Sequence, residues 1–324
     1  MNVRFCFLVF QLMWSTAWAG GLSFDGWGAS FKPPKTAEVF WAASTHHLPN
    51  ALWVYRVIPS KFSSAVVSNM MALGGWTMNQ RTNIPGRPPS RDKDFLHFGG
   101  SNGAELGISS RVGAIEYVNE RARASARGRA ADVPKEDLTL HLALEFLKEV
   151  EIDPGQFAKD TNGSFKVFRG REEQTRNGIT EVISRDVYLI RQLDGVEFAG
   201  LGNYGGVRIS FGDRGKIAEV LVLWPQLDRE SSHRLASPKE LCQWIKDGKS
   251  VIAPRQTTGE ILGQAENLKR ITIRSITPLY MGGNEMEPKQ PGDSIHPFAA
   301  LEVTVNLGHT NLPAVLNCPI IEND

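Results

Sequence analysis

Turn-forming residues divide the stretch from Val187 to Leu227 into segments too short for helices. Asp favours a turn through its side chain, and Gly accepts a positive φ without a clash at Cβ. Between two such breaks, Val207, Ile209 and Phe211 alternate with polar residues, which is the period of a strand with one solvent-facing side. The stretch therefore predicts a β-meander. Its predicted strands are Val187–Gln192, Val196–Ala199, Gly206–Phe211 and Lys216–Trp224.

The first 19 residues have the pattern of a cleaved secretion signal. Arg4 supplies a positive charge, Phe5–Trp14 is almost uniformly apolar, and Ala17–Ala19 has the small-x-small pattern of a cleavage site. The apolar run has about ten residues, which is too short to span a bilayer. We expect cleavage before Gly20 and export to the periplasm or the extracellular space, without stable membrane insertion of the mature chain. The alternative is an uncleaved N-terminal anchor.

The composition is that of a soluble globular protein, with 41% hydrophobic and 22% charged residues. The 36 basic and 35 acidic residues leave a formal net charge of +1. This balance argues against a nucleic-acid partner, because nucleic acids favour a concentrated basic surface. After signal cleavage the cysteines are Cys242 and Cys318, which either form one disulfide or stay separate buried thiols. Without paired spacing they do not make a zinc site.

Residues 20–50 are rich in glycine, proline and aromatic residues, and they predict an irregular N-terminal arm. A first folded unit is expected over residues 51–130. It opens with a strand and a helix whose apolar residues recur at three- and four-residue steps. Short strands follow, and a basic linker marks the expected domain boundary. The expected elements are a strand at Ala51–Ile58, a helix from Ser60 to Leu73, strands at Phe95–Phe98, Glu105–Ser110 and Ala114–Asn119, and the linker Arg121–Arg129.

A second, larger unit is expected over residues 131–324. It begins with a leucine-rich helix that Asp137 is placed to cap, and after the meander Ser237 and Glu240 have the spacing of a capping box. Because a helix is followed by a meander of strands in both halves, the sequence predicts an α+β fold of two related helix-on-sheet units. The expected elements outside the meander are helices at Leu138–Val150 and Pro238–Asp247 and strands at Phe165–Phe168, Val182–Ile183, Arg270–Tyr280 and Phe298–Leu307.

No residue is predicted to be catalytic, to bind a cofactor or to ligate a metal. The histidines lack the H-x-x-x-H spacing of a metalloprotease helix, and the adjacent His46 and His47 fit ordinary loop positions. The glycine-rich segment 200–206 precedes a strand, not the helix that a dinucleotide-binding loop needs. Carboxylate pairs for glycoside hydrolysis depend on three-dimensional separation and stay open as an alternative. The carboxylates considered are Asp186, Asp194, Glu197, Asp213 and Glu219.

In the second half, the leucine-rich helix is followed by an R-x-x-D-G turn, a glycine break, a strand that ends in Trp, and later the YMGG segment 280–283 and Pro297. The matching residues are Arg191, Asp194, Gly195, Gly200, Gly202, Gly215 and Trp224. These features resemble the PepSY-type and YycH/YycI-like extracellular modules of bacteria. The resemblance implies that the helix of each unit packs on a curved antiparallel sheet. The resemblance covers mainly residues 138–307, with a weaker echo in 52–119. It implies an exported, non-catalytic domain that modulates a peptidase or a sensor kinase by binding.

The predicted function is binding or regulation. We expect a protein or peptide partner, bound at an exposed sheet edge or on a concave sheet face, and no cofactor. Two alternatives remain: an enzyme that acts on an envelope or extracellular polymer through turn carboxylates, and a structural component of the envelope.

Overall fold

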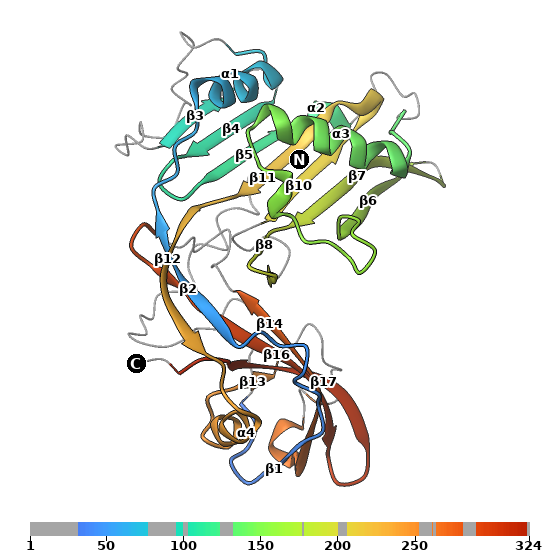
Figure 1. The fold of residues 1–324 in the computed structure, drawn as a ribbon. Coiled ribbons are helices and arrows are strands. Elements are labelled where there is room, and N and C mark those ends of the chain that lie inside the picture. The colour runs from blue at the N-terminus through green and yellow to red at the C-terminus, as the bar shows by residue number, and fades with distance from the viewer. Residues whose placement is uncertain are drawn as a thin grey trace.

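The computed structural model describes residues 32–76, 95–99, 103–123, 132–176, 178–199, 206–252, 261, 264–280 and 290–322. Over these residues the fold is α+β with mostly antiparallel sheets, as predicted. Figure 1 shows two bodies of sheet and helix joined by a pair of long strands. The predicted signal peptide, the glycine break at 200–205 and most of the YMGG segment lie outside the described residues.

The first body is an antiparallel sheet, which we call sheet one, with helices on one face. Its elements are α1 Ser64–Leu73, β3 Phe95–Gly99, β4 Ala104–Ser109, β5 Ala114–Asn119, α3 Glu136–Glu149, β6 Val167–Arg176, β7 Ile179–Ile190, β10 Gly206–Phe211 and β11 Ile217–Leu223. The strand order is β3-β4-β5-β11-β10-β7-β6. In Figure 1, α1 and α3 lie over this sheet, and apolar residues from both helices share one core with alternate strand residues.

The second body is built on another sheet, which we call sheet two. Its elements are β1 Glu38–Trp41, β8 Gln192–Leu193, β9 Val196–Phe198, α4 Pro238–Lys246, β13 Val251–Ile252, β14 Arg270–Tyr280, β16 Pro297–Asn306 and β17 Asn311–Pro319. The strand order is β13-β17-β16-β14-β9-β8, and β1 pairs in parallel with the start of β14. Helix α4 packs near β1 and β17 and buries Leu241 and Ile245 in the core of this body.

A third, small sheet links the two bodies. It consists of β2 Ala51–Ile58, β12 Gln226–Arg234 and β15 Ser294–Ile295, in the order β12-β2-β15. Figure 1 shows β2 and β12 side by side as they pass from one body to the other. β2 leads toward α1, and β12 follows β11 after a short break. The bodies are therefore joined by a hydrogen-bonded ladder, which is stiffer than a single connecting chain.

Several predictions that depend on local sequence signals are confirmed. The observed bounds of β2, β5, β10 and β14 are the predicted ones. The predicted capping box before α4 is also present. Ser237 Oγ accepts the N–H of Glu240 at 3.3 Å, and the N–H of Ser237 donates to Glu240 Oε2 at 2.6 Å. Each end of this exchange satisfies a backbone donor that the helix cannot satisfy by itself.

The predicted β-meander is only partly confirmed. β10 pairs with β7 on one side and β11 on the other, whereas β8 and β9 leave sheet one and form a hairpin in sheet two. Asp194 and Gly195 have φ values of 49° and 80°, as a tight type I′ hairpin requires. β9 then pairs in parallel with Leu279 and Tyr280 at the end of β14. Strands that are neighbours in the sequence therefore belong to different sheets.

Other predicted boundaries are wrong at the ends of elements. Helix α1 begins at Ser64, and Ser63 caps it by accepting the N–H of Val66. Helix α3 begins at Glu136, so Asp137 lies in its first turn and is not the cap. In the arm that was predicted to be irregular, β1 forms because sheet two offers an open edge on β14. The sequence prediction also missed α2, β12, β13, β15, β17 and most of β6.

The predicted division at residue 130, and with it the pair of related units, remains a prediction. Strands from the two sides of that position pair directly, and Glu116 of β5 lies opposite Leu221 of β11. The predicted basic linker begins with the short helix α2 Glu120–Arg123. Arg123 forms an ion pair with Glu219 of β11, and its side chain is only 18% exposed. The described part of this linker is therefore packed on sheet one and is not a solvated connection.

Candidate binding surface

Strand β6 is an edge strand with one open side. It is the last strand of sheet one and pairs along its whole length with β7. Across the parts of the chain that the structure describes, no strand pairs with its other side. β10 reaches β7 only from Arg185 to Ile190, so the far part of the β6–β7 hairpin is a two-stranded ribbon. An open edge presents backbone N–H and C=O groups that can pair with another chain.

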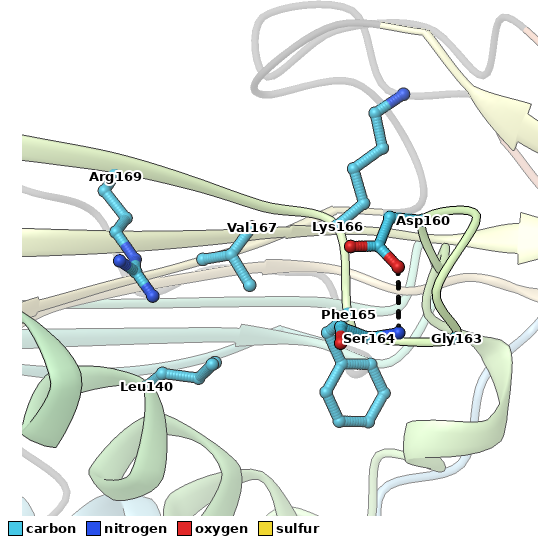
Figure 2. Close-up of a pocket in the computed structure, with 8 residues that line it drawn as sticks. All are labelled: Leu140, Asp160, Gly163, Ser164, Phe165, Lys166, Val167 and Arg169. Carbon is cyan, nitrogen blue, oxygen red and sulfur yellow. Dashed lines mark hydrogen bonds between the residues drawn. The ribbon is translucent and has the colours of Figure 1, made fainter.

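A groove of about 680 Å³ lies beside the start of β6. Its apolar lining comes from Leu140 of α3, from Val167 of β6 and from Phe165, which precedes β6, and all three are half-buried. Figure 2 shows Leu140 on the helix and Val167 on the strand, with Phe165 near the turn that ends the groove. Lys166 also lines the groove and donates through Nζ to Glu197 Oε2 at 2.7 Å. The groove thus combines an apolar lining with an open strand edge.

The turn at 160–164 forms the end of the groove, and its conformation is fixed by one carboxylate. Asp160 Oδ1 accepts the N–H of Asn162 at 2.8 Å and the N–H of Ser164 at 3.0 Å, and Figure 2 shows the second bond. Gly163 has a φ of 81°, which glycine adopts at little cost. Asp side chains commonly stabilise turns in this way. The Asp160 carboxylate therefore has a structural role at this end of the groove.

Arginine side chains continue from the groove along the hairpin. Arg169 donates through one terminal nitrogen to Glu136 Oε1 of α3 at 2.7 Å. This hydrogen bond and the charge of Arg169 lower the pKa of Glu136, and the charges of Arg185 and Arg171 lower it further. The carboxylate of Glu136 therefore lies in the positive field of arginines from both strands of the hairpin.

None of these groove residues was a candidate in the sequence, because β6 was predicted only as a strand at Phe165–Phe168. The following segment, 169–176, is polar and lacks apolar alternation. One usable signal was present: Asn177-Gly178 is the kind of pair that favours a two-residue hairpin turn. Gly178 has a φ of 77° in the structure. That signal predicts a hairpin with strands on both sides of residues 177–178.

Arg191 is one of the residues on which the resemblance to PepSY-type modules rests. It is a buried cation between the two bodies. It is 5% exposed, and its guanidinium carbon lies 4.6 Å from the ring centroid of Trp224. Its Nε donates to Gln156 Oε1 at 3.0 Å, and a terminal nitrogen donates to the carbonyl of Pro225 at 2.8 Å. Burial lowers the pKa of Arg191 to about 10. Within the described ranges no carboxylate pairs with it, so stacking and neutral acceptors hold the charge.

Asp194, which also belongs to the residues that carry the resemblance, connects sheet two to the linking sheet through hydrogen bonds. Its Oδ2 accepts the hydroxyl of Tyr55 of β2 at 2.5 Å, and its Oδ1 accepts from Arg229 of β12 at 2.6 Å. Burial, followed by the hydrogen bond to Asp194 and the charge of that carboxylate, raises the pKa of Tyr55 to about 12. Arg229 also stacks on Trp53, at 4.9 Å from the ring centroid. Asp194 therefore helps to hold the β8–β9 hairpin of sheet two against the linking sheet.

Most of the carboxylates considered for catalysis are dispersed, but Asp186 and Glu219 lie on opposite sides of Arg208. The ion-pair distances from Arg208 are 3.4 Å to Asp186 Oδ2 and 3.0 Å to Glu219 Oε1. Both carboxylates therefore have a structural partner in Arg208, whereas glycoside hydrolysis needs one carboxyl group as a proton donor and the other as a base or nucleophile. The remaining three have separate partners: Asp194 binds Tyr55 and Arg229, Glu197 binds Lys166, and Asp213 accepts the N–H of Asp132.

Histidines, cysteines and carboxylates do not gather into a metal site within the described residues. His46 and His47 are both exposed, and Nε2 of His47 lies 3.1 Å from the carbonyl oxygen of Ile276. Cys242 and Cys318 are both free thiols. Burial raises the pKa of Cys242 and raises that of Cys318 to about 12, which disfavours the reactive thiolate in both.

No protein-family model matches the chain, and no curated protein matches its sequence. A helix with the length and apolar character needed to cross a membrane is absent from the described part of the chain.

Proposed function

We propose that the mature chain is an exported, non-catalytic binding protein that holds an extended segment of a protein partner along the open side of β6. The observation that carries this proposal is the coincidence of an unpaired strand edge with an apolar groove. When a peptide adds to a sheet edge, main-chain hydrogen bonds supply affinity and pockets for alternate side chains supply specificity. Strand β6 offers the first, and the groove offers the second.

Both walls of the groove are held by the core of sheet one. Phe146 and Leu147 anchor α3 in that core, and Val187 and Leu189 anchor β7, which in turn pairs with β6. The ion pair between Arg169 and Glu136 connects the strand directly to the helix. A site that is ordered before binding loses less conformational entropy when the ligand arrives.

The resemblance to PepSY-type modules and the predicted signal peptide support the same class of function. They favour a bacterial protein of the periplasm or extracellular space that regulates a peptidase or an envelope sensor by binding it. The proposed ligand of β6 is then an extended segment of that regulated protein. The proposal includes the prediction that residues 51–130 and 131–324 form two related helix-on-sheet units.

An enzyme that acts on an envelope or extracellular polymer is the second proposal, and the nearness of Asp186 and Glu219 to Arg208 is the observation in its favour. It is the weaker proposal, because both carboxylates already form ion pairs with Arg208 within sheet one. A purely structural role in the envelope, the third alternative, has no comparable feature in its favour.

Selection from a phage-displayed library of random peptides tests the binding proposal on the mature chain. We expect enrichment of peptides with alternating patterns, and synthetic copies of them should slow amide hydrogen exchange in β6. Strand β3, at the opposite edge of sheet one, is the matched control, and its exchange rates should stay unchanged. The physical reason is that an added strand protects only the edge to which it bonds.

Two outcomes would contradict strand addition to β6. The first is a selection that enriches no peptide above the background of the display library. The second is enrichment of peptides that protect β3 or the polar face around Arg208 and leave β6 unprotected. Cleavage of an envelope glycan by the mature chain, lost in Asp186→Asn and Glu219→Gln, would favour the enzyme proposal.

A further inference from the structure

The geometry points to the chemistry of the bound segment: an apolar residue and two acidic residues at successive alternate positions, lying opposite Val167, Arg169 and Arg171. This inference rests on the proposed addition of a strand to β6. In a strand, alternate residues share one face. One extended peptide can therefore place three such side chains next to these β6 positions at once.

The strand register fixes the face on which the β6 residues lie. Val167 is opposite Leu189 and Arg169 is opposite Val187 in the ladder between β6 and β7. Both β7 residues are buried in the core that α3 covers. Residues directly opposite in a ladder share a face, so Val167 and Arg169 lie on the α3 side of sheet one.

The apolar position of the segment follows from the groove. Val167 shares the groove lining with Leu140 and Phe165, and all are half-buried. An apolar side chain that lies opposite Val167 on this face enters the groove and covers apolar surface that is now in contact with water. That burial is favourable and needs no polar partner.

The acidic positions of the segment are inferred from the positive charges that gather on one face of the β6–β7 hairpin. Arg171 lies directly opposite Arg185, and like charges at opposed positions repel. Arg185 is half-buried, and its Nε is buried without a hydrogen-bond partner among the described residues. A carboxylate from an added strand would reduce this repulsion, because it brings an opposite charge to the same face of the hairpin.

Arg169 and Arg171 also keep donors for a ligand. Arg169 binds Glu136 through one terminal nitrogen, and Arg171 binds Glu173 through Nε at 2.9 Å. Their side chains are 38% and 61% exposed. A guanidinium carries five N–H donors in a fork that matches a carboxylate. Each arginine can therefore donate to a second carboxylate while it keeps its present partner.

An acidic peptide fits this surface better than a nucleic acid or an anionic membrane. The opposite face of β6 carries Phe168 and Glu172, so the basic residues form a narrow row on one side of an open strand. Polyanions and charged surfaces favour a broad basic patch, and the chain as a whole has a net charge of only +1. A row at alternate positions matches the period of a bound strand.

The test uses fluorescent peptides with the sequences STLTDTDTS and STDTDTLTS, which cover both chain directions. Each is compared with a version in which Asn replaces both Asp residues. By fluorescence anisotropy, one direction is expected to bind the intact chain about tenfold more tightly with Asp than with Asn, because two charge-assisted hydrogen bonds are added. The advantage should shrink as salt is raised, because exposed ion pairs are screened.

Variants of the chain assign this preference to the arginine row. In R169Q/R171Q the advantage of Asp over Asn should fall to about twofold or less, since the charged donors are gone. The matched control R274Q changes an exposed arginine of β14 in the other body and should leave the advantage intact. Unchanged urea denaturation of both variants confirms that the fold is preserved.

The possible results separate this inference from the function on which it rests. Equal binding of Asp and Asn peptides, with β6 protected in hydrogen exchange, would overturn the acidic preference and leave strand addition standing. Binding of none of the peptides by the intact chain would overturn the acidic preference, and library peptides that still protect β6 would show that strand addition survives. Preferential binding to phosphatidylglycerol vesicles would overturn the inference and identify a lipid surface as the ligand. Dimers that R171Q abolishes would overturn it in favour of a second copy of this chain.

Discussion

Replacing Arg191 with alanine is expected to lower the free energy of unfolding by about 3–5 kcal/mol. The substitution removes the stacking on Trp224 and the hydrogen bonds to Gln156 and to the carbonyl of Pro225. It also leaves a cavity at a position that is 5% exposed. Urea denaturation followed by tryptophan fluorescence measures the loss.

Two variants control the Arg191 experiment. R191M keeps much of the volume and removes a charge that is costly to bury, so its expected loss is smaller, about 1–3 kcal/mol. R274A removes an exposed arginine and should change the free energy of unfolding by less than about 0.5 kcal/mol. If R191A and R274A were equally mild, the stacking and the hydrogen bonds of the buried Arg191 would not contribute to stability as expected.

The substitution Gly113→Ala is expected to cost about 3 kcal/mol or more. Gly113 has a φ of 64°, and a Cβ there would lie 2.4 Å from the carbonyl oxygen of Trp224 and 2.6 Å from Cα of Pro225. The carbonyl of Gly113 also accepts the N–H of Trp224 at 2.8 Å. The close neighbours are backbone atoms, so relief of the clash requires movement of the chain where β11 leads toward β12.

Gly248→Ala separates the clash from the cost of the backbone conformation. Gly248 has a φ of 77°, but nothing lies within 4 Å of the position that its Cβ would take. The substitution should therefore lower the free energy of unfolding by only about 1–2 kcal/mol, which is the cost of placing a residue with a Cβ in the left-handed conformation. Chemical denaturation of both variants provides the comparison, and equal losses would show that the contact of Gly113 with Trp224 and Pro225 does not constrain the junction.

The sequence predicted those strands and helix ends that depend on local hydrophobic patterns and on capping residues. Apolar alternation located β10, a nearly continuous apolar run located β2, and capping chemistry located α4. Strand β12 was missed because it is polar and mostly exposed, so its sequence has no apolar period. It forms because β2 offers it a ladder, and that partner lies far away in the sequence.

The candidate site was less predictable than the fold for the same reason. Beyond residue 168, β6 is a polar edge strand, and its groove depends on the distant Leu140. Arg191 and Asp194 stood out in the sequence as parts of a turn pattern. Their roles required partners that no local pattern reveals, since Asp194 binds Tyr55 from 139 residues away.

The most direct test of strand addition to β6 uses peptides from the library selection, resynthesised with N-methyl groups on alternate amides in two complementary patterns. One pattern removes the donors that face β6, and the other removes the donors that face solvent. If the peptide adds to β6 as a strand, the first pattern should weaken binding by about tenfold or more, whereas the second should change it by about threefold or less. Similar affinities for the two patterns would contradict strand addition, because a bound strand must distinguish the two sides of its backbone.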